Sequence, residues 1–154
     1  MPEKEPEHVV AKNRKAWHDY HILQRFEAGI VLLGTEVKAV RAGHIGLRDA
    51  YAAFDNGELF LFNVSISPYK DRGYSEHDER RRRKLLLHAD ELRKLRRQID
   101  EKGNTIIPLQ LYFKGRVLKA EIAVARGKKE YDKRDQKEKA MMARELQREL
   151  KNRR

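Results

Sequence analysis

The sequence predicts a mainly β fold: a small antiparallel OB-like barrel with two or three helices, followed by a basic C-terminal tail. About five or six segments have strand-like composition, and every connection between them allows antiparallel pairing. The length of 154 residues suits one domain with a hydrophobic core. A closed barrel leaves no exposed sheet edge, so we prefer it to the alternative architecture, a β-sandwich.

The first strand is expected after a polar N-terminal segment. Residues 1–12 are polar and charged, and we predict that they form a flexible N-terminus. Residues 20–26 are rich in strand formers and lead into an apolar run over residues 27–33. Gly29 lies inside this run, which predicts either a β-bulge or the close approach of another backbone segment.

A short helix is predicted next, over residues 35–42. Val37 and Val40 are three positions apart, so they share one helix face and would point toward the core. Gly43 follows directly and is expected to end the helix.

A β-hairpin is predicted after this helix. Residues 50–54 and 59–64 are strand-like and flank Asn56 and Gly57. An Asn-Gly pair between two such runs is the strongest short-range signal for a hairpin. The segment that follows, residues 65–79, contains proline, glycine and charges of both signs, which predicts a loop.

A longer helix is predicted over residues 88–101. Leu92, Leu95 and Ile99 recur at helical spacing, which indicates one apolar face. Gly103 is expected to end this helix and to begin the turn into the next strand.

The last hairpin is predicted to join residues 105–113 to residues 118–124 through a tight turn at residues 114–116. Both runs alternate between apolar and polar side chains. In the first strand, the residues expected on one side are Ile107, Leu109, Leu111 and Phe113. In the second strand, the inner face would comprise Leu118, Ala120, Ile122 and Val124.

The composition indicates a polyanionic partner. The chain has 35 Lys and Arg against 24 Asp and Glu, a net charge of +11. Residues 126–154 alone carry twelve Lys and Arg against six Asp and Glu, which is +6 of that total. We therefore divide the chain into a barrel over residues 13–131 and a basic tail over residues 132–154. A charge excess outside the core is typical of nucleic-acid binding.

Other classes of protein are disfavoured. The chain has no cysteine, so it has no disulfide framework and no thiolate metal site. The sequence lacks the apolar run of about 20 residues that a membrane helix needs, and its first residues do not resemble a signal peptide. We therefore expect a cytoplasmic protein that does not enter membranes.

The sequence gives no positive argument for an enzyme. None of the six histidines has the spacing of a zinc-binding HExxH motif, and neither a Walker A motif nor GxSxG occurs. We therefore predict neither a catalytic residue nor a metal or other cofactor. A nuclease would need a carboxylate cluster or a His/Lys constellation, and we find neither.

Cations beside aromatic residues are the first candidate RNA contacts. Asn13, Arg14 and Lys15 precede Trp17, the only tryptophan, in a pattern that suits unstacked bases. The alternative is that Trp17 and Tyr20 plug one end of the barrel. Glu27 is a further candidate, because a carboxylate accepts hydrogen bonds from base edges.

A run of cations over residues 80–84 is the second candidate. Arg82, Arg83 and Lys84 lie in it, and we expect a flexible loop that contacts phosphates. The alternative is a solvated run that only keeps the protein soluble. Four consecutive arginines exceed what solubility requires, which favours the phosphate-binding interpretation.

Several segments together resemble one protein family, in order and over about residues 10–154. These segments are residues 13–16, 26–30, 34–38, 41–43, 60–63, 83–88, 108–114 and 127–134. The chain resembles the SsrA-binding protein (small protein B) family of bacterial trans-translation. This resemblance implies an OB-type barrel that binds the tRNA-like domain of transfer-messenger RNA, also called SsrA RNA.

The resemblance also implies what the complex does. The family delivers the aminoacylated RNA to stalled ribosomes for ribosome rescue and peptide tagging, and elongation factor Tu is a possible further partner. The tail reaches the decoding centre and the empty mRNA channel, where it folds as a helix. A constitutive rRNA-binding protein of OB type, ribosomal or translation-factor-like, is the alternative function.

Two groups of residues match positions with roles in the family. Asn13, Glu27 and Leu86 match positions linked to RNA binding. Residues 127–134, which we call the tail root, match the motif that faces rRNA of the decoding centre. The tail-root contacts carried over are Gly127, Lys128, Lys129, Tyr131, Asp132, Lys133 and Arg134. Tyr131 stands where many members carry histidine, and the tail has no tryptophan.

Overall fold

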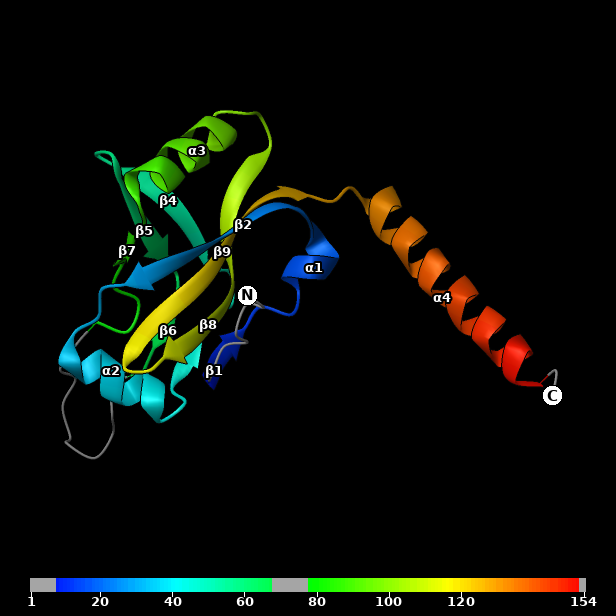
Figure 1. The fold of residues 1–154 in the computed structure, drawn as a ribbon, viewed down its shortest axis with the longest axis horizontal. Helices are drawn as coiled ribbons and strands as arrows, with labels where there is room; N and C mark the ends of the chain where they lie inside the picture. The colour runs from blue at the N-terminus through cyan, green and yellow to red at the C-terminus, as the bar shows by residue number, and fades with distance from the viewer. Residues whose placement is uncertain (1–7, 68–77, 153–154) are drawn as a thin grey trace.

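The computed structural model describes residues 8–67 and 78–152. The first half contains β1 (His8–Lys12), α1 (Ala16–Asp19), β2 (Tyr20–Ile30), α2 (Gly34–Arg41), β3 (Ile45–Gly46), β4 (Tyr51–Asp55) and β5 (Glu58–Phe62). The second half contains β6 (Ser65–Ile66), β7 (Arg83–Leu86), α3 (Ala89–Ile99), β8 (Asn104–Lys114), β9 (Val117–Gly127) and α4 (Glu130–Asn152). Figure 1 shows these elements in a barrel-shaped body from which α4 projects.

The main sheet closes on itself as an antiparallel barrel. Its strands pair in the order β8-β4-β5-β7-β2-β9, and β9 pairs again with β8 to complete the ring. Strand β1 pairs with the part of β8 that lies past its contact with β4. Strand β3 pairs with β6 in a separate two-stranded sheet. The mainly β, OB-like prediction is therefore confirmed.

The two predicted hairpins are confirmed. Strands β4 and β5 are joined by Asn56 and Gly57, with φ of 49° and 77°, the left-handed pair that a tight hairpin turn requires. Strands β8 and β9 pair along their whole length and are joined at Gly115, where φ is 59°.

The predicted helices form close to their expected bounds. In α2, Val40 is buried and Val37 is half-buried, and Gly43 ends the turn with φ of 84°. In α3, Leu95 is buried and packs on the barrel core. Figure 1 shows α3 across one end of the barrel, and Leu92 and Ile99 of its apolar face also pack on the core.

The expected alternation along β8 is wrong in its first half. The register shifts between Pro108 and Gln110, so Leu109 is an extra residue opposite β9. A bulge of this kind reverses the side-chain faces on one side of it. Leu111 therefore points into the main core, whereas Ile107 and Leu109 pack on the outside of the barrel.

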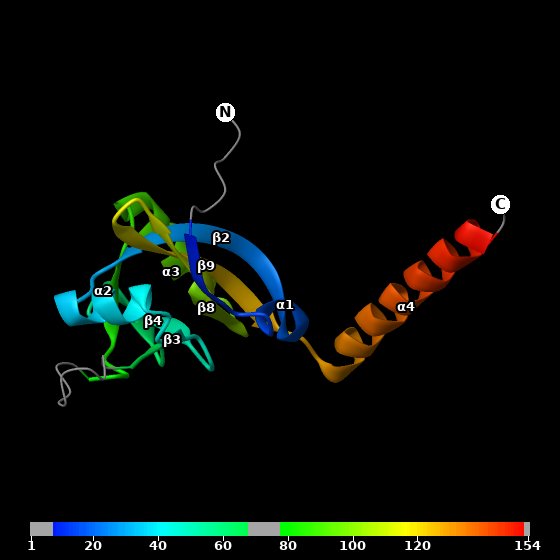
Figure 2. The same ribbon diagram turned by 90° about the horizontal axis from the view of Figure 1, so that it is seen from below.

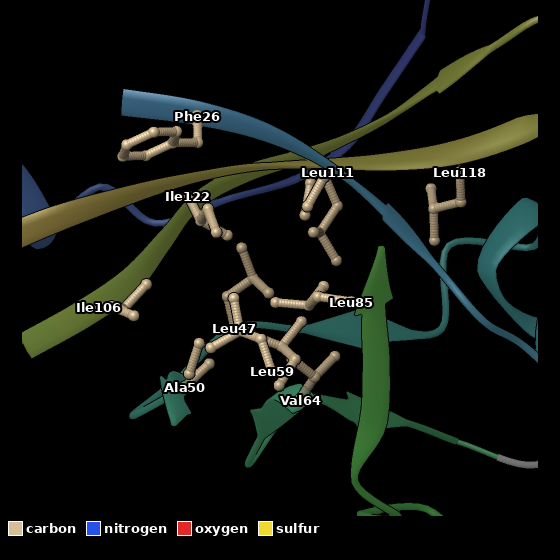
Figure 3. Packing of buried hydrophobic residues seen from close by; sticks show 14 of the residues in the cluster. Phe26, Leu47, Ala50, Leu59, Val64, Leu85, Ile106, Leu111, Leu118 and Ile122 are labelled. Carbon is tan, nitrogen blue, oxygen red and sulfur yellow. The ribbon is translucent and has the colours of Figure 1, made fainter. Parts of the chain in front are cut away.

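The main core lies inside the barrel and is formed by aliphatic side chains from facing strands. The inner face predicted for β9 is confirmed, because its four residues are all buried in this cluster. Figure 3 shows Ile122 and Leu118 of β9 directed toward Leu59 and Leu85 across the interior. A second, smaller cluster outside the barrel packs α1 against β8 and β9 through Ala16.

Three other expectations differ from the structure or lie partly outside it. Residues 8–12, expected in a flexible terminus, form β1, which pairs with β8. The bulge in β2 falls between Ile22 and Gln24 and not at Gly29. A methyl group added at Gly29 would lie 3.6 Å from the Cβ of Leu86 on the neighbouring strand. Most of the predicted loop over residues 65–79 lies outside the described residues.

Candidate nucleic-acid interface

A basic cleft lies between the N-terminal segment and the turn before β4. Its volume is about 690 Å³. Four basic and two acidic residues line it, so its wall carries net positive charge. The charged residues of this basic cleft are Lys12, Arg14, Lys15, Arg48, Asp19 and Asp49. Such an arrangement suits phosphates of a nucleic-acid backbone.

Asn13 holds the cleft together. Its backbone N–H donates to the carbonyl of Leu109 at 2.8 Å, and its side-chain Nδ2 donates to the carbonyl of Pro108 at 3.0 Å. Both acceptors lie in the bulge of β8, where a strand partner is missing. Asn13 therefore fixes the segment from which Arg14 and Lys15 extend.

Sequence reasoning missed two cations of the cleft. Lys12 lies in β1, which was expected to be flexible, and Arg48 comes from the turn between β3 and β4. Arg48 is distant in sequence from Arg14, and no local motif marks it. The closed barrel brings the two together.

Trp17 lies on the surface of the barrel. Its side chain is 50% exposed, and the Arg25 guanidinium lies 5.9 Å from the centre of its ring. The alternative that Trp17 plugs a barrel end is therefore wrong. A half-exposed indole with a cation over it offers a face for base stacking.

Glu27 projects from β2 as an ionised acceptor. Its Oε2 accepts from the Tyr112 hydroxyl at 2.5 Å and lies 2.9 Å from Lys114 Nζ. Burial alone would raise the pKa of Glu27, but these hydrogen bonds outweigh it and hold that pKa below its ordinary value. A carboxylate has further lone pairs, so Glu27 can still accept from a base edge.

The interpretation of Arg83 as a phosphate contact is corrected by the structure. Arg83 is 1% exposed and donates to the carboxylate of Glu36 through both Nε, at 2.8 Å, and Nη2. Its Nη1 donates to the carbonyl of Val64 at 2.6 Å. This guanidinium is buried and bonded to interior groups, so it is not accessible to RNA.

Arg82 and Lys84, the other two candidates of this run, are on the surface but have acidic neighbours. Arg82 lies 2.5 Å from Asp55 and 4.2 Å from the centre of the Phe60 ring, and Lys84 lies 3.4 Å from Glu58. These cations belong to β7 and the residue before it, so they are ordered on the barrel rather than in a flexible loop. Their contact with RNA stays a prediction.

Leu86 is exposed on the neighbouring strand. Its side chain is 52% exposed, and its backbone pairs with Gly29 of β2, two positions from Glu27. The structure thus places Glu27 and Leu86 on adjacent strands, whereas Asn13, Arg14 and Lys15 gather in the cleft.

The tail root leaves the barrel beside α1. The Lys128 amide donates to the carbonyl of Asp19 at 2.8 Å, and Lys133 Nζ lies 3.5 Å from the Asp19 carboxylate. Lys129 and Arg134 are exposed, and Gly127 ends β9. The side chains of Tyr131 and Asp132 lie outside the described part of the structure.

Beyond its root, α4 contacts solvent. Figures 1 and 2 show from two directions that the helix points away from the barrel. Four large apolar side chains on it are 60–68% exposed: Met141, Met142, Leu146 and Leu150. Basic residues surround them, which suits a helix that enters a polyanionic environment.

The described part of the chain offers neither a metal-binding cluster nor a membrane-spanning helix. Within residues 8–67 and 78–152, no three His, Asp or Glu side chains are grouped so that they could hold a metal ion. None of the helices in that part of the chain is long and apolar enough to cross a membrane.

Comparison with known proteins decides the family. The family model described as SmpB protein matches residues 10–152. This chain belongs to the SmpB family. The SsrA-binding protein of Carboxydothermus hydrogenoformans is 50% identical over 147 residues, which are 96% of this chain and 99% of that protein. That of Acetivibrio thermocellus is 51% identical over 148 residues, which are 96% of each chain.

A solved structure of an SmpB protein agrees with the fold. The match has a TM-score of 0.66 at 49% identity and covers 77% of this chain and 84% of the other. That structure is described as "tmRNA-SmpB: a journey to the center of the bacterial ribosome". The basic cleft, Glu27 and Leu86 therefore lie on an SmpB-family barrel, and α4 follows it.

Proposed function

We propose that this chain is an RNA-binding adaptor in trans-translation. It binds the tRNA-like domain of transfer-messenger RNA and delivers this RNA to stalled ribosomes for rescue and peptide tagging. The observation that carries the proposal is a basic cleft on an SmpB-family barrel from which a basic helix projects. Relatives at 50% identity are SsrA-binding proteins, and they support the choice of RNA.

The two parts of the chain divide the work. The barrel, from β1 to β9, holds the RNA through the basic cleft and through Glu27 and Leu86. The tail, over residues 132–154, probes the decoding centre and the empty mRNA channel. Elongation factor Tu arrives with the aminoacylated RNA, and the whole process takes place in the cytoplasm, where ribosomes act.

The adaptor acts through binding and does not catalyse a reaction. Cations track the phosphates, Trp17 offers a stacking surface, and Glu27 accepts from base edges. Phosphate contacts supply most of the affinity and make it depend on salt, while the aromatic ring and the carboxylate add discrimination.

A gel-shift titration with the isolated tRNA-like domain tests the proposal. The full chain should bind this RNA more tightly than it binds an elongator tRNA at the same salt concentration. Equal binding to both RNAs would contradict it. Occupancy of idle ribosomes in stoichiometric amounts would instead favour a constitutive rRNA-binding protein.

Two cations of the cleft are expected to contact phosphates. Replacing Arg14 or Arg48 with alanine should weaken binding and reduce the slope of log affinity against log salt by about 1 for each change. The titration is repeated at several salt concentrations. Arg116→Ala removes an exposed cation from the β8–β9 turn and should leave the slope unchanged. An equal effect of all three changes would show that overall charge, not the cleft, governs binding.

A further inference from the structure

Helix α1 lies between the basic cleft and the tail root. Asp19, its last residue, lines the cleft together with Lys15 and Ala16. The same residue contacts the chain where it leaves β9. Figure 2 shows α1 beside the point where the chain turns from β9 into α4. One short segment therefore contacts both candidate functional parts.

Two hydrogen bonds hold the junction between strand and helix. The Lys128 amide donates to the carbonyl of Asp19 at 2.8 Å, and Lys128 Nζ donates to the carbonyl of Trp17 at 3.0 Å. Both acceptors are backbone atoms, so these contacts do not depend on which side chain stands at position 19. They fix where the tail starts.

An ion pair also links α1 to the first turn of α4. Lys133 lies in the first turn of α4, and its Nζ is 3.5 Å from Asp19 Oδ1. His18 Nδ1 lies 2.8 Å from the same oxygen and orients the carboxylate. Both members of the pair are partly exposed, at 26% for Lys133 and 38% for Asp19. Such a pair biases the direction of a helix without locking it.

We infer that Asp19 is a positioning residue that couples the basic cleft to the direction in which α4 leaves the barrel. Asp19 lines the cleft where RNA would lie, and its carboxylate lies 3.5 Å from Nζ of Lys133 in the tail. RNA in the cleft immobilises α1 and thereby the start of the tail. The inference deepens the proposed function and rests on it for the identity of the RNA.

The absence of cysteine allows a direct distance measurement. Spin labels are placed at Arg116→Cys, in the β8–β9 turn, and at Lys137→Cys, in α4, both exposed positions. Pulsed electron resonance then gives the distance distribution in the free protein. Adding Asp19→Asn should broaden or shift this distribution, because the charge that attracts Lys133 is lost while the backbone contacts remain.

Asp49→Asn is the matched control. Asp49 lines the same cleft, and its left-handed backbone, with φ of 60°, accepts asparagine readily. This change removes the same charge from the cleft and should leave the distance distribution as it is. Exchanging the pair, with Asp19→Lys and Lys133→Asp together, should restore a narrow distribution.

Peptide tagging provides the functional measurement. Asp19→Asn should reduce tagging more than it reduces affinity for the tRNA-like domain, whereas Asp49→Asn, which changes only the charge of the cleft, should change tagging and affinity in proportion. An unchanged distance distribution in Asp19→Asn, or an equal effect of both variants, would overturn the inference. Equal binding of the tRNA-like domain and an elongator tRNA would refute the proposed function. It would not affect the distance result, because the distance between the labels is measured in the free protein.

Discussion

Replacing Glu36 with glutamine should lower the free energy of unfolding by about 3 kcal/mol or more, because it leaves the buried Arg83 guanidinium without a counter-charge. Glu36 is fully buried and accepts from Arg83, from Arg81 at 2.5 Å and from the Leu33 amide at 2.8 Å. The change removes the carboxylate charge to which the Arg81 and Arg83 guanidinium groups donate but keeps the shape of the side chain. Urea denaturation followed by circular dichroism measures the loss.

The exposed pair of Arg82 and Asp55 is the control for this prediction. Its side chains are 48% and 47% exposed, so Asp55→Asn should cost less than about 1 kcal/mol. If both variants lose similar stability, the Glu36 network does not hold α2 against β7 in the way the structure indicates.

Acid should weaken the same network. Burial alone would raise the pKa of Glu36, but hydrogen bonds from Leu33, Arg81 and Arg83 outweigh it, so that pKa lies below its ordinary value of 4.5. The contribution of Glu36 to stability is then complete above this value and is lost as the pH falls through the lower, folded-state pKa. Urea denaturation at pH 7 and pH 4 should show a smaller pH dependence in Glu36→Gln than in the unchanged protein.

Deleting residues 135–154 should leave affinity for the tRNA-like domain largely intact and abolish peptide tagging. The cleft, Glu27 and Leu86 all lie on the barrel, and α4 points away from it. The deletion also keeps Lys133 and its pair with Asp19. Gel-shift titration and a tagging assay on the same truncated protein measure the two effects. Equal loss of both activities would contradict the division of labour between barrel and tail.

Local patterns in the sequence predict most of the fold. Asn56 and Gly57 identify the first hairpin because few other residues adopt the left-handed backbone of its turn. The helical spacing of Leu92, Leu95 and Ile99 identifies α3 for a similar local reason. These elements form where they are expected, since propensity, pattern and turn chemistry agree in them.

Features that depend on contacts between distant residues could not be predicted. The bulge at Pro108 is where Asn13 binds, and it reverses the faces of Ile107 and Leu109. The sequence alone indicates that Arg83 is a surface cation. In the fold, Arg83 pairs with Glu36, which is 47 positions away in the sequence. Patterns of charge show how many cations a chain has but not which of them the fold buries.

The candidate site also contains residues that the sequence predicted and residues that it did not. The sequence identified Arg14 and Lys15, which do lie in the basic cleft, but it gave no sign of Arg48. The family resemblance marked Glu27 and Leu86, which the barrel places on adjacent strands. Only the closed barrel shows that α1 connects the cleft to the tail root.

The most direct test of the adaptor role is peptide tagging in a reconstituted translation system. Ribosomes are stalled on a message that lacks a stop codon and are supplied with alanyl-transfer-messenger RNA and elongation factor Tu. We expect the tag to be added to the stalled chain only when this protein is present in its full length. Tagging at the same rate without the protein, or no tagging with it although it binds the RNA, would contradict the account.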